Sequence, residues 1–214
     1  MSASADKDHP TVYVIDDDAS VREALRGLFE SVRLQTETYA SVQDFLASAP
    51  SNRPCCIVLD IRLPGQGGLE FQEALAKRSD SRPIVVISGH VDVQMAVRAM
   101  KAGAVDVLTK PVREQDLLEA VNRAIAKDRQ HRYEGRARQS LLSRYATLSE
   151  REKQIMALVA AGKLNKQIAA DVDLTEATVK LHRGQVMRKM GAESVAHLVR
   201  LADMLQNASG ETLP

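Results

Sequence analysis

The sequence predicts an α/β domain with a doubly wound, five-stranded parallel sheet, followed by a second, all-α domain. Five short strand-like runs alternate with segments of helical periodicity over residues 11–127, which is the pattern of a parallel sheet. The run Cys55–Leu59 is continuously apolar, as expected of a strand buried on both faces. From Thr147 onward no strand pattern recurs, and short helical segments follow one another.

The expected elements of the first domain follow in strict alternation. Strands are expected at 11–15, 35–39, 55–59, 84–87 and 105–109, and the polar second one reads as an edge strand. Helices are expected at 19–32, 42–47, 68–78 and 91–102, and a last one from Glu114. The side chains expected to face inward are Val21, Leu25, Leu28, Phe29 and Val32 in the first helix, Val93, Val97 and Met100 in the fourth, and Leu117, Leu118, Val121 and Ile125 in the last.

Two polar tails and a polar connection flank the domains. Residues 1–10 and 207–214 are expected to be tails. Residues 128–146 are rich in Arg and Gln and form a linker that we expect to be partly helical. This segment can extend the last helix or be flexible, and Gly135 makes a break plausible.

The second domain, residues 147–206, is expected to hold four short helices. Ser149 and Glu152 form a capping box at the start of the first. A tight turn at Asp173-Leu174 joins the second and third, which indicates a helix-turn-helix core. The expected buried stripe of the third helix is Val179, Val186 and Met190.

Composition narrows the functional classes. The 214 residues carry a net charge of +1. About 15 basic and 18 acidic side chains lie in residues 1–127, against about 14 and 10 beyond, so the second domain is mildly basic, a weak indication of a polyanionic partner. No stretch is apolar enough to span a membrane and no signal core is present, so we expect a cytoplasmic protein without a membrane partner. Cys55 and Cys56 are expected to be inert core thiols, and no zinc-binding spacing occurs.

Charged and hydroxyl side chains follow the ends of the expected strands: Asp16 and Asp17, Asp60, Ser88 and Lys110. Parallel strands bring their carboxyl ends to one edge of a sheet. Clustered carboxylates repel one another unless a cation such as Mg²⁺ takes their oxygens as ligands. A carboxylate beside Mg²⁺ and a lysine can attack a phosphoryl group, giving an aspartyl phosphate at Asp60. The alternative is that Asp16 to Asp18 only cap the following helix.

These residues carry a resemblance to a known family. Asp16-Asp17, Asp60 with Pro64-Gly65, Ser88-Gly89-His90 and Lys110-Pro111 resemble the receiver domain of two-component response regulators, in order over residues 11–127. The resemblance implies a flavodoxin-like fold with Asp60 as phosphoacceptor and with Mg²⁺ held by Asp16, Asp17, Asp60 and the backbone carbonyl of Arg62. It implies further that Ser88 and Lys110 contact the phosphoryl group and that the Lys110-Pro111 peptide bond is cis.

One position departs from the receiver pattern. Receivers usually carry an aromatic residue three positions before the lysine, where this sequence has Val107. Val112 also stands where Phe is common. The switch residues implied by the resemblance are Ser88 and Val107, and the aromatic part of the switch is absent here.

The third helix of the second domain has two distinct sides. Opposite its buried stripe lie Lys180, Leu181, Gly184 and Arg188, a basic and apolar face that suits a DNA major groove. The alternative is an ordinary solvated face. The stretches 148–152, 165–169 and 178–183 resemble the LuxR-type helix-turn-helix, and 186–190 with 196–200 resemble its FixJ branch. This implies base contacts from Lys180, Leu181 and Gly184, and phosphate contacts from Lys166, Thr178, Arg183 and Arg188. Gly184 has no side chain, so specificity is expected from Lys180, Gln185 and DNA shape.

Together these features predict a response regulator of the FixJ type. We expect a partner sensor histidine kinase to phosphorylate Asp60, homodimerisation through the fourth and fifth helices and fifth strand, and binding to promoter DNA and RNA polymerase. Two rivals stay open. One is a small phosphatase, although Arg62 stands where a second catalytic acid would serve. The other is a DNA binder independent of phosphorylation. No metabolic reaction is expected.

Overall fold

The computed structural model of the chain describes residues 9–48, 53–64, 67–77, 80–89 and 92–209. Gly65 and His90, which belong to the quoted receiver motifs, lie outside the described residues. The chain divides into two compact units, residues 1–132 and 133–214.

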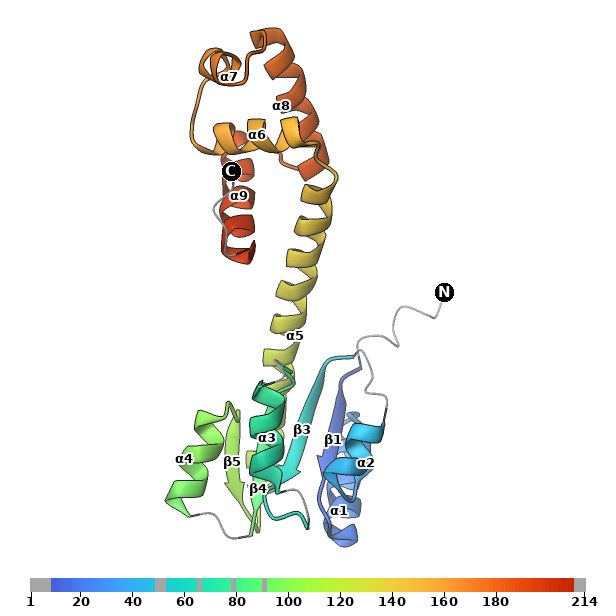
Figure 1. Cartoon of the computed structure of the whole chain (residues 1–214). Helices are drawn as coiled ribbons and strands as arrows, with labels where there is room; N and C mark the ends of the chain where they lie inside the picture. The colour runs from blue at the N-terminus through green and yellow to red at the C-terminus, as the bar shows by residue number, and fades with distance from the viewer. Residues whose placement is uncertain (1–8, 49–52, 65–66, 78–79, 90–91, 210–214) are drawn as a thin grey trace. The chain divides into compact units, whose positions relative to one another are not determined.

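The first unit is built on a five-stranded sheet. Its strands are β1 (Thr11–Ile15), β2 (Gln35–Tyr39), β3 (Cys55–Asp60), β4 (Ile84–Ser88) and β5 (Asp106–Thr109) (Figure 1). All neighbours are parallel, in the order β2-β1-β3-β4-β5. The predicted fold class is confirmed, with the polar β2 at one edge as expected.

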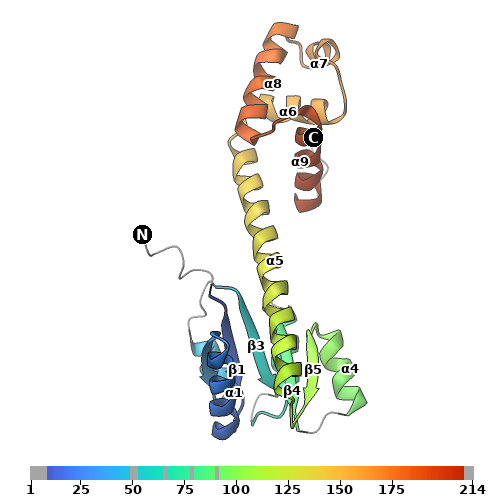
Figure 2. The same ribbon diagram turned by 180° about the vertical axis from the view of Figure 1, so that it is seen from behind.

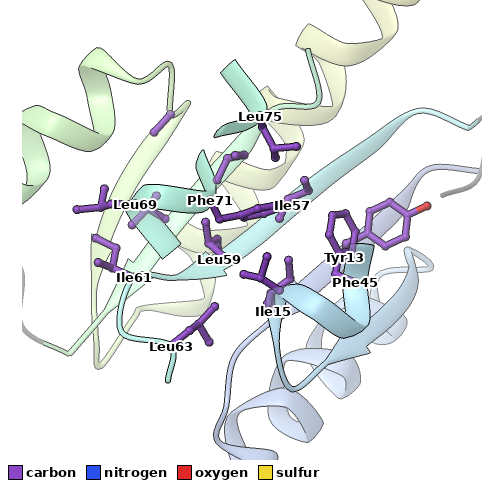
Figure 3. Packing of buried hydrophobic residues seen from close by; sticks show 14 of the residues in the cluster. Tyr13, Ile15, Phe45, Ile57, Leu59, Ile61, Leu63, Leu69, Phe71 and Leu75 are labelled. Carbon is purple, nitrogen blue, oxygen red and sulfur yellow. The ribbon is translucent and has the colours of Figure 1, made fainter. Parts of the chain in front are cut away.

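Helices cover both faces of this sheet. They are α1 (Ala19–Ser31), α2 (Val42–Ala47), α3 (Gly68–Lys77), α4 (Val93–Lys101) and α5 (Glu114–Ala146). Successive strand residues point to opposite faces, so Tyr13 and Ile15 pack with α2, α3 and α4 (Figure 3), while Val12 and Val14 pack with α1 and α5 (Figure 2). Each helical layer therefore seals one apolar face of the strands.

The prediction of which side of α4 faces the core is wrong. Val93, Val97 and Met100 are 80%, 46% and 49% exposed, whereas Ala99 is fully buried and Met95 packs against the core. The helix carries apolar residues on two sides, so its periodicity does not single out the buried one. The side with the small Ala99 lets the helix approach the sheet closely. Val32 is also misplaced, because it caps the C-terminus of α1 and is 46% exposed.

The helix α5 is continuous through residues 128–146, and Gly135 lies inside it. Near the sheet, Asp128 is buried and accepts hydrogen bonds from the Cys55 amide at 2.8 Å and from Arg132 Nε at 2.6 Å. None of the described helices has an apolar stretch able to cross a bilayer.

The second unit contains α6 (Glu150–Ala160), α7 (Asn165–Asp171), α8 (Glu176–Met190) and α9 (Val195–Ser209). The capping box of Ser149 and Glu152 forms as expected, and Asp173, with φ of 52°, makes the turn between α7 and α8. The buried core includes Ile155, Met156, Val159, Ile168, Val179, Val186, Met190, Leu198 and Leu205, and also Leu141 of α5. The last turns of α5 thus belong to this core, although the sequence placed them in the linker.

Candidate functional site

Strand register brings the expected site residues to one sheet edge. Ile15 of β1 pairs with Leu59 of β3, so the acids that follow these two residues are neighbours. On the other side, Asp60 pairs with Ile87 of β4, next to Ser88. The Lys110 amide donates to the Ser88 carbonyl at 2.8 Å, so the lysine follows β5 at the same edge.

Lys110 bridges two carboxylates. Its Nζ lies 2.6 Å from Oδ2 of Asp16 and 2.6 Å from Oδ2 of Asp60. Asp16 is fully buried, and Asp60 is only 6% exposed. Burial raises the pKa of Asp16 despite the lysine beside it. For Lys110, burial acts to lower the pKa, but the hydrogen bonds to both acids outweigh it and the pKa is raised. The ammonium therefore stays charged at neutral pH.

A third acid completes a cluster suited to a divalent cation. Carboxylate oxygens of Asp16, Asp17 and Asp60 all lie within 4.8 Å of one another, and Asp17 is exposed to solvent. One lysine cannot neutralise three carboxylates, and oxygen donors at this spacing are those that hard divalent ions prefer. The residues present therefore fit such an ion, with Asp17 on the open side.

Two further predicted residues lie near this edge. Ser88 is fully buried, and its hydroxyl has no hydrogen-bond partner among the described residues. Val107 in β5 is partly buried and packs against the core under α2, α3 and α4. The Lys110-Pro111 peptide bond is cis, as expected. The Arg62 amide donates to Oδ1 of Asp60 at 2.9 Å, and the role of the Arg62 carbonyl stays a prediction.

The second unit presents the expected face on α8. Lys180, Leu181, Gly184 and Arg188 are exposed, with Leu181 62% exposed, and Lys166 at the start of α7 is exposed too. Space around Gly184 is open, since no described atom lies within 4 Å of where a Cβ would stand. Thr178 and Gln185 are half-buried, and the Thr178 hydroxyl lies 2.9 Å from that of Thr175. An exposed helix face with a lysine, an arginine and a leucine can enter a groove of DNA, and Lys166 of α7 adds a second exposed lysine.

Comparison with known proteins identifies the family of each domain. Residues 12–122 match the family model described as response regulator receiver domain, and residues 146–202 match that described as bacterial regulatory proteins, luxR family. The chain is a two-component response regulator. The resemblance to response regulators of the FixJ type that the sequence shows is thereby confirmed. The protein is a transcription regulator with a LuxR-type DNA-binding domain.

Relatives and solved structures match this regulator over nearly its whole length. Nodulation protein W of Bradyrhizobium diazoefficiens is 46% identical over 201 residues, covering 94% of this chain and 88% of that protein. Transcriptional regulatory protein FixJ of Rhizobium meliloti is 40% identical, covering 90% and 94%. The low-resolution structure of response regulator StyR is 42% identical, with a TM-score of 0.85 and coverage of 91% and 98%. FixJ and StyR are named as regulators, which leaves the phosphatase alternative without support.

The acidic turn of the regulator is held in part by Arg22, a residue that sequence reasoning missed. Arg22 Nη1 donates to the carbonyls of Asp16 at 2.8 Å and Asp17 at 2.9 Å. Asp18 caps α1 by accepting from the amides of Ser20 and Val21. Of the three consecutive acids, only Asp18 caps the helix, so the capping alternative does not account for Asp16. The sequence signal for Arg22 was weak, because an arginine five or six residues after an acidic turn is common.

Gly68 is the other missed residue, and it lies against the end of β3 at Asp60. Its amide donates to the Ile61 carbonyl at 2.9 Å. A Cβ at Gly68 would stand 2.3 Å from the Asp60 carbonyl oxygen and 2.9 Å from the Ile61 Cα. Only glycine lets α3 begin this close to the end of β3. In the sequence, Gly68 stands out only as the first residue of an expected helix, a position where glycine has many other uses.

Arg183 was expected to contact phosphate, and in the structure it ties two helices together. It is half-buried, and its Nη1 donates to Oδ1 of Asn165, joining α8 to the start of α7. A phosphate contact by Arg183 stays a prediction.

Proposed function

We propose that Asp60 accepts a phosphoryl group from a sensor histidine kinase, with Mg²⁺ bound, and that this controls dimerisation and promoter binding. The observation that carries the proposal is the bridge from Lys110 to Asp16 and Asp60, beside a buried Ser88 hydroxyl without a described partner. In this arrangement the nucleophile, the counter-charge and a spare hydrogen-bond donor meet at one sheet edge.

The chain's own residues divide the work of phosphoryl transfer. An Asp60 carboxylate oxygen forms the new bond to phosphorus while the bond from phosphorus to the donor's histidine nitrogen breaks. The electron pair of that bond stays on the nitrogen, which takes a proton from solvent if it needs one. Lys110 can shift its hydrogen bond from Asp60 to a phosphoryl oxygen, and the Ser88 hydroxyl can donate to another. Asp16, Asp17 and Asp60 would hold Mg²⁺, which neutralises charge on the phosphoryl oxygens when it is bound.

Phosphorylation by acetyl phosphate tests this assignment. With Mg²⁺ present, the mass of the intact protein should rise by one acid-labile phosphoryl group, and Asp60→Asn should abolish the gain. Asp18→Asn is the matched control, because Asp18 is two residues from Asp16 yet only caps α1, and asparagine caps a helix equally well. Labelling of Asp60→Asn at the level of the control would remove Asp60 as the acceptor.

A hollow beside the site suits a protein phosphodonor. It has a volume of about 310 Å³ and is lined by apolar residues of α1 and by the start of α5, together with Lys110 and Pro111. Leu25 of α1 is one of these lining residues. Leu25→Lys should slow transfer from a phosphorylated histidine kinase but not from acetyl phosphate, which needs no docking surface. Equal slowing with both donors would contradict docking at this hollow.

The exposed side of α4 supports dimerisation. Val93, Val97 and Met100 follow one another at helical spacing, and apolar side chains gathered on one exposed helix face mark an interaction surface. Val97→Lys should weaken the dimer formed in beryllofluoride, as measured by sedimentation. Val32→Lys is the matched control, because both valines are 46% exposed. Equal dimer dissociation constants for the two variants would exclude this face.

A further inference from the structure

The C-terminal end of α8 is held by the end of α5 and by the segment that follows it. Arg144 Nη1 in α5 donates to the Met190 carbonyl at 3.2 Å. Met190 is the last residue of α8, where carbonyls lack a helical partner and the helix dipole is negative. A cation at this place is therefore favoured both as a hydrogen-bond donor and as a charge.

Gly191 shapes the seat for this guanidinium. It ends α8 in the left-handed region, with φ of 66°. A Cβ there would stand 2.7 Å from Arg144 Nη1 and 3.5 Å from its Cζ. The guanidinium thus lies directly over the glycine, in space that a side chain would fill.

A second contact holds the same end of α8 to the start of α6. Lys189 Nζ lies 2.6 Å from Oε2 of Glu152 and 3.1 Å from the Thr147 carbonyl. Glu152 is buried and also accepts from the Ser149 amide at 2.7 Å. Leu141 of α5 is buried in the same core, and Tyr145 packs against it. The C-terminal end of α8 is thus held by Arg144 of α5 and by Glu152 of α6, above a core to which the last turns of α5 contribute.

We propose that Arg144 is a positioning residue for DNA reading, which fixes the direction of α8 by holding its C-terminal end against α5. The proposal rests on the assignment of α8 as the helix that enters the DNA groove. Lys180, Leu181 and Gly184 occupy the part of α8 away from this contact, and a small tilt at one end of a helix displaces side chains along its length. Base contacts depend on such placement, whereas phosphate contacts by flexible lysines tolerate it.

The test compares two arginines of α5 in the full chain. Arg144→Ala removes the contact, Arg144→Lys keeps a donor, and Arg136→Ala removes an exposed arginine of the same helix. DNA probes are a duplex that the wild-type protein enriches from a random library and a scrambled duplex. Arg144→Ala should weaken binding to the enriched duplex by at least about tenfold, roughly the loss of one good base contact, with little change on the scrambled one. Arg144→Lys should restore most of this loss, and Arg136→Ala should behave as wild type.

Two outcomes overturn the proposal. Equal behaviour of Arg144→Ala and Arg136→Ala would show that the contact does not matter for DNA. An equal loss on both duplexes, with a salt dependence shallower by about one unit, would make Arg144 a phosphate contact instead.

A double-mutant cycle separates positioning from a general loss of stability. If Arg144 acts through the base contacts of α8, Arg144→Ala should cost less once Lys180→Ala has removed one of them. Additive losses would overturn the proposal. The assignment of α8 is checked independently, because it fails if Lys180→Ala alone leaves binding to the enriched duplex unchanged.

Discussion

Gly68→Ala is expected to destabilise the receiver unit and to slow phosphorylation of Asp60. Real Cβ atoms essentially never lie within 3.0 Å of another heavy atom, and this one would stand 2.3 Å from the Asp60 carbonyl oxygen. Both partners are backbone, so neither can turn aside as a side chain would. Overpacking of this kind costs about 1–3 kcal/mol. For a unit of this size that lowers the melting temperature by about 4–12 °C.

The same displacement reaches the carboxylate proposed to accept the phosphoryl group, because the peptide that must move belongs to Asp60 itself. A shift of several tenths of an ångström at a reacting group should slow transfer from acetyl phosphate by about tenfold or more. Gly67→Ala is the matched control, since its Cβ would meet only the Glu70 side chain, at 3.9 Å. Calorimetry and intact-mass phosphorylation kinetics compare the two variants. If both melt at the same temperature and react at the same rate, the reasoning is refuted.

Three other predictions address DNA reading, pH and the switch. Lys180→Ala should weaken binding to an enriched duplex by about 1–3 kcal/mol and relax sequence preference, because it removes a base contact. Lys166→Ala should instead weaken binding to all DNA alike and make the salt dependence of binding shallower by about one unit, because it removes a phosphate contact. Identical salt slopes for the two variants would contradict the assignment of Lys180 to bases and Lys166 to phosphate. Burial opposes ionisation of Glu152, but Lys189 and the Ser149 amide hold the pKa of Glu152 below the ordinary 4.5. The ionised Glu152 therefore stabilises the fold fully above pH 4.5, and this stabilisation is lost as pH falls through the lowered pKa. The difference in melting temperature between wild type and Glu152→Gln should therefore become smaller in acid. A difference that does not change with pH would show that ionisation of Glu152 does not stabilise this unit. With valine at position 107, beryllofluoride should strengthen dimerisation by only about 1–3 kcal/mol, and the protein without beryllofluoride should still bind DNA appreciably. Val107→Phe should widen the difference in dimer dissociation constant between the two forms. A wild-type dimer dissociation constant that falls by well above about a hundredfold in beryllofluoride, as measured by sedimentation, would contradict the limit set by valine.

The strands and the cluster of acids and lysine at their carboxyl ends could be predicted because the signals were local and agreed with one another. Each buried run ended at the residue that carries the chemistry, and parallel pairing then had to bring those ends together. The structure brings Asp60, Lys110 and Asp16 together in this way, with Lys110 Nζ 2.6 Å from a carboxylate oxygen of each acid. Asp17 also lies in this cluster, and its exposure to solvent is a feature that only the structure shows.

The orientation of α4 could not be read in the same way. Both of its sides offer apolar residues, and the larger ones, Val93 and Met100, suggested the core. Close packing against the sheet favoured the side with Ala99, which a scale of hydrophobicity ranks lower. A surface that binds another protein also needs exposed apolar side chains. A binding face on α4 therefore has the same apolar pattern that, read alone, predicts burial against the core.

Contacts between distant residues lay beyond any local pattern. Arg144 meets Met190 across 46 positions, and Glu152 meets Lys189 across 37. Glu152 was recognised only as the partner of Ser149 in the capping box, which is its local role. Its contact with α8 depends on how four helices pack, and no spacing in the sequence encodes that packing directly.

The two cysteines bear on how the regulator can be studied. Cys55 and Cys56 are 1% and 0% exposed, and burial raises the pKa of Cys55 to about 11 and that of Cys56 further still. Thiolates are the species that react with maleimides and methanethiosulfonates, so both native thiols should stay silent toward such reagents. Single cysteines introduced at exposed positions, for example at Gly27 in α1 and Met204 in α9, would then accept spin labels without removing any native residue from the core. Distances between such labels, recorded with and without beryllofluoride, would follow the two units of the unaltered fold as the signal passes from one to the other.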